Sequence, residues 1–169
     1  MKKQTKIVIL SVVFLLIATA ALWYINSGGV NRQGGGSLIV FTKEGEVVAE
    51  AGIQYMRGLE SETFEAVIRS SGNRPVEVEY TGVLLMDLLA GTGIDTTNLE
   101  KVIVKGLDGY MIKLLTGELT EKGIFIAYEM DGAPIAGRAE GGFGPFQLVI
   151  PGDAFSQRWC KYVCEVAVE

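Results

Sequence analysis

Hydrophobic positions along the chain form one long uninterrupted block, followed by many short alternating runs. Residues 7–25, IVILSVVFLLIATAALWYI, contain no charged side chain. At about 1.5 Å per residue, a helix of this length can cross a hydrocarbon core of roughly 30 Å. Lysines precede the block, and Trp23 and Tyr24 stand at its far end, where aromatic rings favour the membrane interface. The pattern predicts a single transmembrane anchor, with residues 1–6 as a basic cytoplasmic tail.

A cleaved signal peptide is the alternative for this block, because residues 18–20, ATA, have the small-x-small form of a cleavage site. The apolar run continues past that site through residues 22–25, which favours the anchor. Residues 26–37, NSGGVNRQGGGS, are dominated by glycine and polar residues and predict a flexible linker. The domain that follows, residues 38–169, is therefore expected outside the cell, held at the cell membrane.

This outer domain alternates between short apolar and polar runs that are separated by turn residues, which is typical of strands and hairpins. Helices are expected over residues 53–58 and 83–90, the second with Thr81 as its N-cap and Gly91 as its stop. Strands outnumber helices and show no βαβ rhythm, so the predicted fold class is α+β. The expected strands cover residues 38–42, 46–49, 63–69, 102–105, 110–114, 124–129, 146–150 and 162–168.

The charge balance limits the classes of partner. The whole chain carries a formal charge of −5; without the three N-terminal lysines, 12 lysines and arginines against 20 aspartates and glutamates leave −8. An acidic outer domain argues against binding nucleic acid or an anionic lipid surface. The chain has no histidine. This excludes histidine-based zinc or haem sites and any catalytic triad that needs an imidazole.

The two cysteines, Cys160 and Cys164, lie near the C-terminal end. An even count in an oxidising compartment suggests a disulfide. Four residues along a strand span about 13 Å, however, whereas bridged Cα atoms lie within about 7 Å. A bridge therefore requires Cys160 to lie in a turn before the strand. The strand interpretation places both thiols on one apolar face with Tyr162, as small buried side chains, and we favour it.

Four segments of the outer domain stand out in order along the chain: YTGVLLMDLL at 80–89, DGY at 108–110, GGFGPFQLVIP at 141–151 and RWCK at 158–161. Together they resemble the molybdopterin-binding oxidoreductase domain, the sulfite-oxidase-like fold. The resemblance covers roughly residues 38–168, and the ordered set is moderately specific for fold and less so for activity. It implies a mixed-sheet α+β domain that holds a molybdenum cofactor through its pterin and one protein thiolate.

The resemblance also implies site residues, and at one of them this sequence departs from the family pattern. The metal-ligating cysteine of the family matches Ser70, while Gly72, Asn73 and Arg74 are retained in the segment RSSGNRP. A serine oxygen is a harder and less acidic ligand than a thiolate. On the resemblance, Ser70 is the candidate metal ligand and catalytic residue. The candidate cofactor-binding residues are Asn73, Arg74, Tyr110, Arg158 and Lys161.

Each of these residues also has a purely structural interpretation. Ser70 can simply open a turn, Tyr110 can pack on a sheet, and residues 141–144 can serve either to cradle an anion or to lead into a strand. Two functions from different classes remain. One is a membrane-tethered molybdopterin-dependent oxidoreductase with a redox partner protein. The other is a cofactor-free module on the same fold that binds a small molecule or docks a protein.

Overall fold

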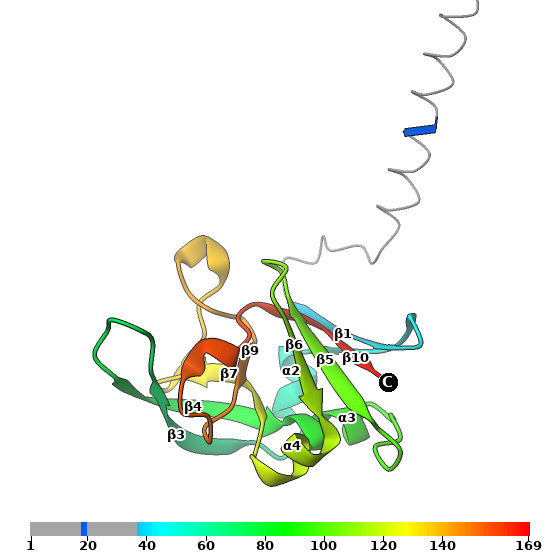
Figure 1. Ribbon diagram of the computed structural model, residues 1–169, viewed down its shortest axis with the longest axis horizontal. Coiled ribbons are helices and arrows are strands. Elements are labelled where there is room, and N and C mark those ends of the chain that lie inside the picture. Colours follow the sequence, from blue (N-terminus) through cyan, green and yellow to red (C-terminus); the bar gives the residue numbers. More distant parts are fainter. Residues whose placement is uncertain (1–17, 20–36) are drawn as a thin grey trace, which may run out of the picture. The chain divides into compact units, whose positions relative to one another are not determined.

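The computed structural model describes residues 18–19 and 37–169 of the chain (Figure 1). Chain contacts divide the molecule into two units, Met1–Gln33 and Gly34–Glu169, and the second contains the folded domain. The expected cytoplasmic tail, and nearly all of the expected anchor and linker, fall outside the described residues. In the part of the chain that the structure describes, no helix is long and apolar enough to span a membrane.

Ten strands and three short α-helices build the domain, which confirms the mixed α+β class. The helices are α2 (Ile53–Arg57), α3 (Leu85–Gly91) and α4 (Thr116–Glu121). Two 3₁₀ turns are η2 (Arg138–Glu140) and η3 (Ser156–Arg158). The strands are β1 (Leu38–Lys43), β2 (Glu46–Gly52), β3 (Glu62–Ile68), β4 (Val76–Leu84), β5 (Lys101–Gly106), β6 (Met111–Leu115), β7 (Phe125–Met130), β8 (Ala133–Pro134), β9 (Gln147–Val149) and β10 (Val163–Val168).

The strands form two five-stranded sheets. The first has the order β2-β1-β10-β5-β6 and is mixed, because β1 runs parallel to β10 while its other pairs are antiparallel. In the second, β3-β4-β7-β8 follow one another and β9 also pairs with β7, all antiparallel. The first sheet thus joins the first and last strands of the domain at its centre.

The predicted hairpins are confirmed because local turn chemistry fixes them. The β1–β2 turn places Glu44 and Gly45 at φ 53° and 86°, and the β5–β6 turn places Gly109 at φ 87°. Glycine adopts such left-handed angles without steric cost, and short hairpin loops require them. Along β5 the burial pattern alternates in step with the pleat, which puts Val102 and Val104 in the core.

The helix expected over residues 83–90 begins later than the sequence suggested. Residues up to Leu84 belong to β4, and Thr81 pairs with Glu129 of β7 in the ladder and caps nothing. Gly82 explains why the strand continues, since an added Cβ there would lie 2.6 Å from the carbonyl oxygen of Ile126. The expected Thr81 cap is therefore wrong, because close sheet packing overrides the local helix signal.

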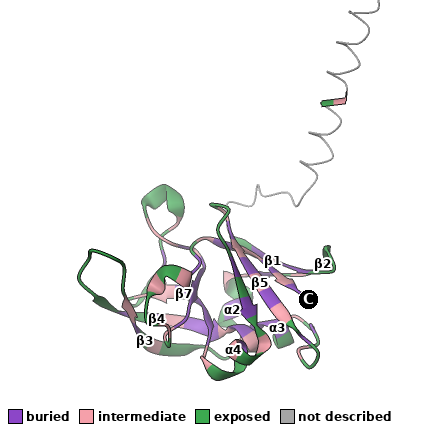
Figure 2. Ribbon diagram, in the orientation of Figure 1, coloured by how far each residue is buried: buried purple, intermediate pink, exposed green. Residues whose placement is uncertain are grey.

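One contiguous core lies between the sheets and helices, and the loops around residues 69–77 and 136–142 are largely exposed (Figure 2). Aromatic side chains lie in this core and along its edge, where Phe64 is only partly buried. The rings of Phe64 and Phe125 stack with centroids 4.1 Å apart, and Trp159 meets the edge of Tyr80 at 6.1 Å. Trp159 is only 5% exposed, and its other side faces the cavity described next.

Candidate functional site

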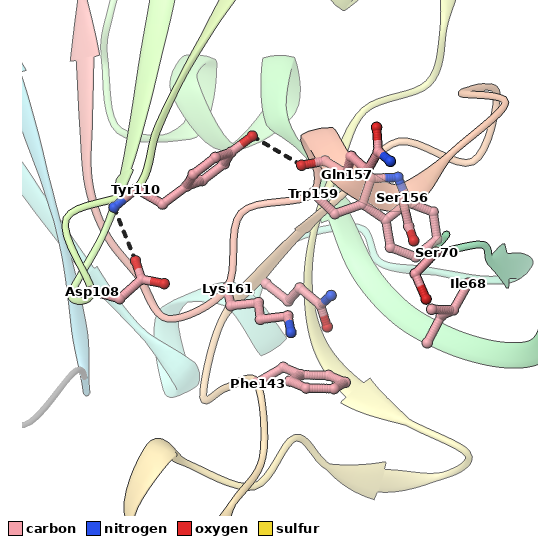
Figure 3. Close-up of a pocket in the computed structure, with 10 residues that line it drawn as sticks. Ile68, Ser70, Asp108, Tyr110, Phe143, Ser156, Gln157, Trp159 and Lys161 are labelled. Atoms are coloured by element: carbon pink, nitrogen blue, oxygen red, sulfur yellow. Dashed lines mark hydrogen bonds between the residues drawn. The ribbon is translucent and has the colours of Figure 1, made fainter. Parts of the chain in front are cut away.

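A cavity of about 460 Å³ opens where the end of β3, the β5–β6 turn, the loop before β9 and the segment after η3 come together (Figure 3). Pockets of this size suit small organic ligands. Three of the sequence-predicted site residues line it: Ser70, Tyr110 and Lys161. The full lining is Ile68, Ser70, Asp108, Tyr110, Phe143, Gln147, Ser156, Gln157, Trp159 and Lys161.

Ser70 stands at the start of the turn that follows β3. Its Oγ accepts a hydrogen bond from Asn73 Nδ2 at 3.0 Å, and its carbonyl oxygen accepts one from the Asn73 amide at 3.3 Å. Gly72 completes the turn with a φ of 82°. Asn73 therefore orients Ser70 and does not itself line the cavity. Arg74 is exposed and is also absent from the lining among the described residues.

Tyr110 crosses the cavity from the β5–β6 turn. Asp108 Oδ1 accepts a hydrogen bond from the Tyr110 amide at 3.0 Å, and the Tyr110 hydroxyl donates one to the carbonyl oxygen of Gln157 at 3.0 Å. Burial raises the pKa of Tyr110, and the electrostatic effect of Cys160 raises it further. The phenol therefore stays protonated and remains a donor. The bond ties the β5–β6 turn to η3 across the cavity.

Lys161 reaches over the ring of Phe143, with Nζ 4.0 Å from the ring centroid (Figure 3). The contact is a cation–π interaction, which suits an ammonium that has no closer charged partner. No carboxylate lies within ion-pair distance of Lys161 in the described residues. Its charge is therefore available at the mouth of the cavity.

Arg158 lies outside the cavity lining, in an ion-pair cluster with α4. Its Nη2 is 2.9 Å from Glu118 Oε1, and its Nη1 is 3.4 Å from Asp153 Oδ2. Lys122 contacts the same two carboxylates at 3.4 and 3.1 Å. Asp153 is only 8% exposed, and its Oδ2 makes no hydrogen bond despite the nearby guanidinium. The cluster fixes the segment that carries Gln157 and Trp159.

The glycine-rich segment before β9 serves close packing. An added Cβ at Gly142 would lie 2.0 Å from the carbonyl oxygen of Ala136, and one at Gly144 would lie 2.3 Å from that of Ile135. The Gly144 amide also donates a hydrogen bond to the Ala136 carbonyl oxygen at 2.8 Å. These contacts support the strand-leading interpretation of residues 141–144 over an anion cradle.

The two cysteines do not share a strand face, so that expectation is wrong. Cys160 precedes the strand and is fully buried, whereas Tyr162 takes a φ of 55° and β10 begins only at Val163. No disulfide joins Cys160 to Cys164. Burial raises the pKa of Cys160 to about 12, with further contributions from Asp108 and Cys164, so its thiol stays protonated.

Sequence reasoning missed several lining residues, above all Gln147. This side chain is 2% exposed, and its Oε1 accepts a hydrogen bond from the Tyr80 hydroxyl at 3.4 Å. A polar residue inside the apolar run 146–150 was the available signal, because buried amides need partners. Phe143 and Trp159 lay within the matched motifs, but nothing in the sequence showed that they face a cavity.

The fold is that of the sulfite-oxidase-like family of molybdopterin-binding oxidoreductase domains. Residues 46–169 match the model of the oxidoreductase molybdopterin binding domain, and the chain belongs to this family. Among solved structures, it is similar to the sulfane dehydrogenase SoxCD from Paracoccus pantotrophus, with 17% sequence identity and a TM-score of 0.63. The match covers 84% of this chain and 40% of the SoxCD chain. Because the sequence identity is this low, the likeness concerns the fold alone. No curated protein matches the chain.

The side chains of the cavity do not fit a molybdenum that is held by a protein thiolate. No cysteine is present in the cavity lining formed by the described residues, and Ser70, which the resemblance matches to the ligand, carries a hydroxyl. Cys160 is buried, and its sulfur contacts the carbonyl oxygen of Lys161 at 3.6 Å. In residues 18–19 and 37–169, no group of three cysteines or carboxylates could hold a metal ion.

Proposed function

We propose that this chain is a membrane-anchored extracytoplasmic domain that binds a small molecule in the cavity without a thiolate-held molybdenum. The observation that carries the proposal is the donor set. Ser70, which the family resemblance matches to the metal ligand, has its Oγ oriented by Asn73. The remaining lining offers aromatic rings, an amide, a carboxylate and one ammonium. Such a lining suits an organic ligand better than a soft metal.

Anchoring forms the second half of this proposal and rests on sequence. The uncharged block 7–25, the lysines before it and the linker 26–37 support a domain held outside the membrane. Protease digestion of intact cells and of inverted membrane vesicles tests this topology. Digestion of the domain only in inverted vesicles would contradict it.

The deciding experiment measures metal and pterin in the purified full-length chain. The chain is produced in a host that makes the molybdenum cofactor and extracted in mild detergent; molybdenum is then measured by mass spectrometry and pterin by fluorescence after oxidation. We expect molybdenum far below one atom per chain. Near-stoichiometric molybdenum together with pterin would overturn the cofactor-free proposal.

A molybdopterin-dependent oxidoreductase with a redox partner is the second candidate, because Ser70 lines the cavity at the ligand position of its family. Two substitutions separate the candidates. If Ser70 holds the metal, Ser70→Ala removes molybdenum from an otherwise folded chain. If the missing thiol is what prevents loading, Ser70→Cys raises the molybdenum content while Ser70→Ala leaves it at the wild-type level.

A further inference from the structure

Several lining side chains already use their donors within the protein. Ser156 Oγ donates a hydrogen bond to the carbonyl oxygen of Arg69 at 2.8 Å and accepts one from its amide at 3.1 Å. Trp159 Nε1 donates to the carbonyl oxygen of Ile150 at 3.1 Å. The Tyr110 hydroxyl is likewise committed across the cavity. These groups form walls, and a ligand must be recognised by other donors.

Gln147 supplies one such donor in the cavity lining. Burial raises the pKa of Tyr80 to about 12, and Asp131 adds to the rise, while the hydrogen bond with Gln147 opposes it; the phenol therefore remains a donor. It therefore fixes Oε1 of Gln147 toward Tyr80. Gln147 lines the cavity, and the one side-chain hydrogen bond it makes in the described residues engages Oε1 and leaves Nε2 uncommitted. Nε2 is not one of the fully buried unpaired atoms of the described residues, so it is open to the cavity and can donate to a ligand.

Lys161 supplies the second donor in the same lining. Its ammonium has the Phe143 ring as a neighbour and no carboxylate at ion-pair distance in the described part of the domain. Asp108 also lines the cavity, and its Oδ1 accepts the hydrogen bond from the Tyr110 amide. The cavity therefore contains charges of both signs, and the experiment must decide which one selects the ligand.

Size and wall chemistry restrict the ligand further. A cavity of about 460 Å³ is several times larger than a small inorganic oxyanion, given that one water occupies about 30 Å³. Its walls include the rings of Phe143, Trp159 and Tyr110. Aromatic walls stabilise a flat apolar body by burial and by offset or edge contacts. The lining therefore combines two donors with an aromatic compartment.

On the basis of the proposed function, we propose that the cavity binds an aromatic carboxylate. Its carboxylate accepts hydrogen bonds from Lys161 Nζ and Gln147 Nε2, and its ring contacts the aromatic walls. This assignment uses both donors of the lining, neutralises the ammonium and fills the apolar volume with a single ligand class.

The proposal is tested by titrating benzoate into the purified full-length chain in detergent. Ligand-observed saturation-transfer NMR measures the binding. The comparison probes are benzamide, which lacks the charge, benzylamine, which reverses it, and sulfate, which lacks the ring. We expect benzoate to bind at least about tenfold more tightly than each of the three, because charge-assisted hydrogen bonds exceed neutral ones. Equal or tighter binding of benzamide, benzylamine or sulfate overturns the assignment, and so does the absence of benzoate binding.

Matched variants locate the binding. Lys161→Met should weaken benzoate binding about tenfold, with partial recovery in Lys161→Arg. Gln147→Glu keeps an acceptor for Tyr80 while replacing the donors by a negative charge, and it should weaken binding further. Lys113→Met removes the same charge from an exposed position of β6, outside the cavity, and should leave binding unchanged.

Equal loss of binding in Lys113→Met and Lys161→Met overturns the assignment, since the effect would then be one of overall charge. Should Gln147→Glu fail to fold, the comparison of Lys161→Met with Lys161→Arg still decides. Failure of this inference is distinguishable from failure of the proposed function. Benzamide or benzylamine as the preferred probe leaves a binding module with another ligand class, whereas near-stoichiometric molybdenum in the same preparation refutes the module itself.

Discussion

Replacing Arg158 tests whether this residue acts as a structural clamp, as its contacts indicate, or holds a ligand, as the family resemblance implied. In Arg158→Leu, Glu118 loses a contact at 2.9 Å and Asp153 loses one at 3.4 Å. Both carboxylates keep Lys122 as a partner. We therefore expect destabilisation of the empty domain, without any ligand present.

The magnitude follows from exposure. At an effective dielectric constant near 20, each pair attracts by on the order of 4 kcal/mol, but desolvation offsets most of this. Exposed pairs contribute about 0.2–1 kcal/mol, and breaking a buried pair costs about 3–5 kcal/mol. Arg158 is 38% exposed and Asp153 only 8%, so the cluster falls between these limits. We expect a loss of about 1.5–2 kcal/mol, or roughly 5–8 °C in Tm for a domain of this size.

Thermal unfolding of the full-length chain, followed by intrinsic tryptophan fluorescence, measures this loss, because Trp159 is 5% exposed in the folded domain. Arg74→Leu is the matched control, since Arg74 is exposed and makes no ion pair in the described residues. It should change stability by less than about 0.5 kcal/mol. An unchanged Tm in Arg158→Leu, with loss of benzoate binding, would refute the clamp and return Arg158 to the binding site.

Three further predictions concern packing and titration. Gly106→Ala should destabilise the domain by more than about 2 kcal/mol, because the added Cβ would lie 2.5 Å from a backbone carbonyl oxygen. Gly117→Ala in α4 should stabilise the domain by about 0.5–1 kcal/mol, because the added Cβ meets nothing within 4 Å. Chemical denaturation measures both changes. Cys160 should resist a thiol reagent at pH 8 until the domain unfolds, because its pKa is raised to about 12; rapid labelling of two thiols per native chain would contradict this. Burial raises the pKa of Glu118, but the hydrogen bonds from Arg158 and neighbouring groups lower the pKa below its usual 4.5. The contribution of Glu118 to stability is therefore complete above pH 4.5 and is lost as the pH falls through the lower pKa of the folded state. Unfolding midpoints measured from pH 6 to pH 3 should therefore fall less steeply in Arg158→Leu than in wild type, and parallel curves would refute the coupling.

Local turn chemistry made the hairpins predictable, whereas long-range packing did not reveal itself in the sequence. The β5–β6 turn needs only an Asp-Gly pair between alternating runs. Residues 83 and 84 were predicted as helix but belong to β4, because a buried apolar run is compatible with either a helix or a strand. Only the neighbouring strand shows why Gly82 belongs to the sheet: its missing Cβ makes room for the backbone at Ile126 and Ala127.

The same division applies to the site. Ser70, Tyr110 and Lys161 were found through the family resemblance, and all three line the cavity. Gln147 was missed because its role depends on Tyr80, 67 positions away in the sequence. The sequence also could not show that the Arg158 side chain forms ion pairs outside the cavity. Its partner Glu118 lies on α4, a short helix that the apolar pattern did not indicate.

The parallel pairing of β1 with β10 has a consequence for how the domain is made. In the first sheet, the β1–β2 hairpin contacts the β5–β6 hairpin through β10 alone, and β10 is built from residues 163–168. During synthesis, the sheet therefore cannot close until β10 has been made. A chain truncated before residue 163 would leave two separate ribbons with unpaired edges. Such edges favour aggregation, so cellular quality control should detect truncated chains far more readily than most point variants.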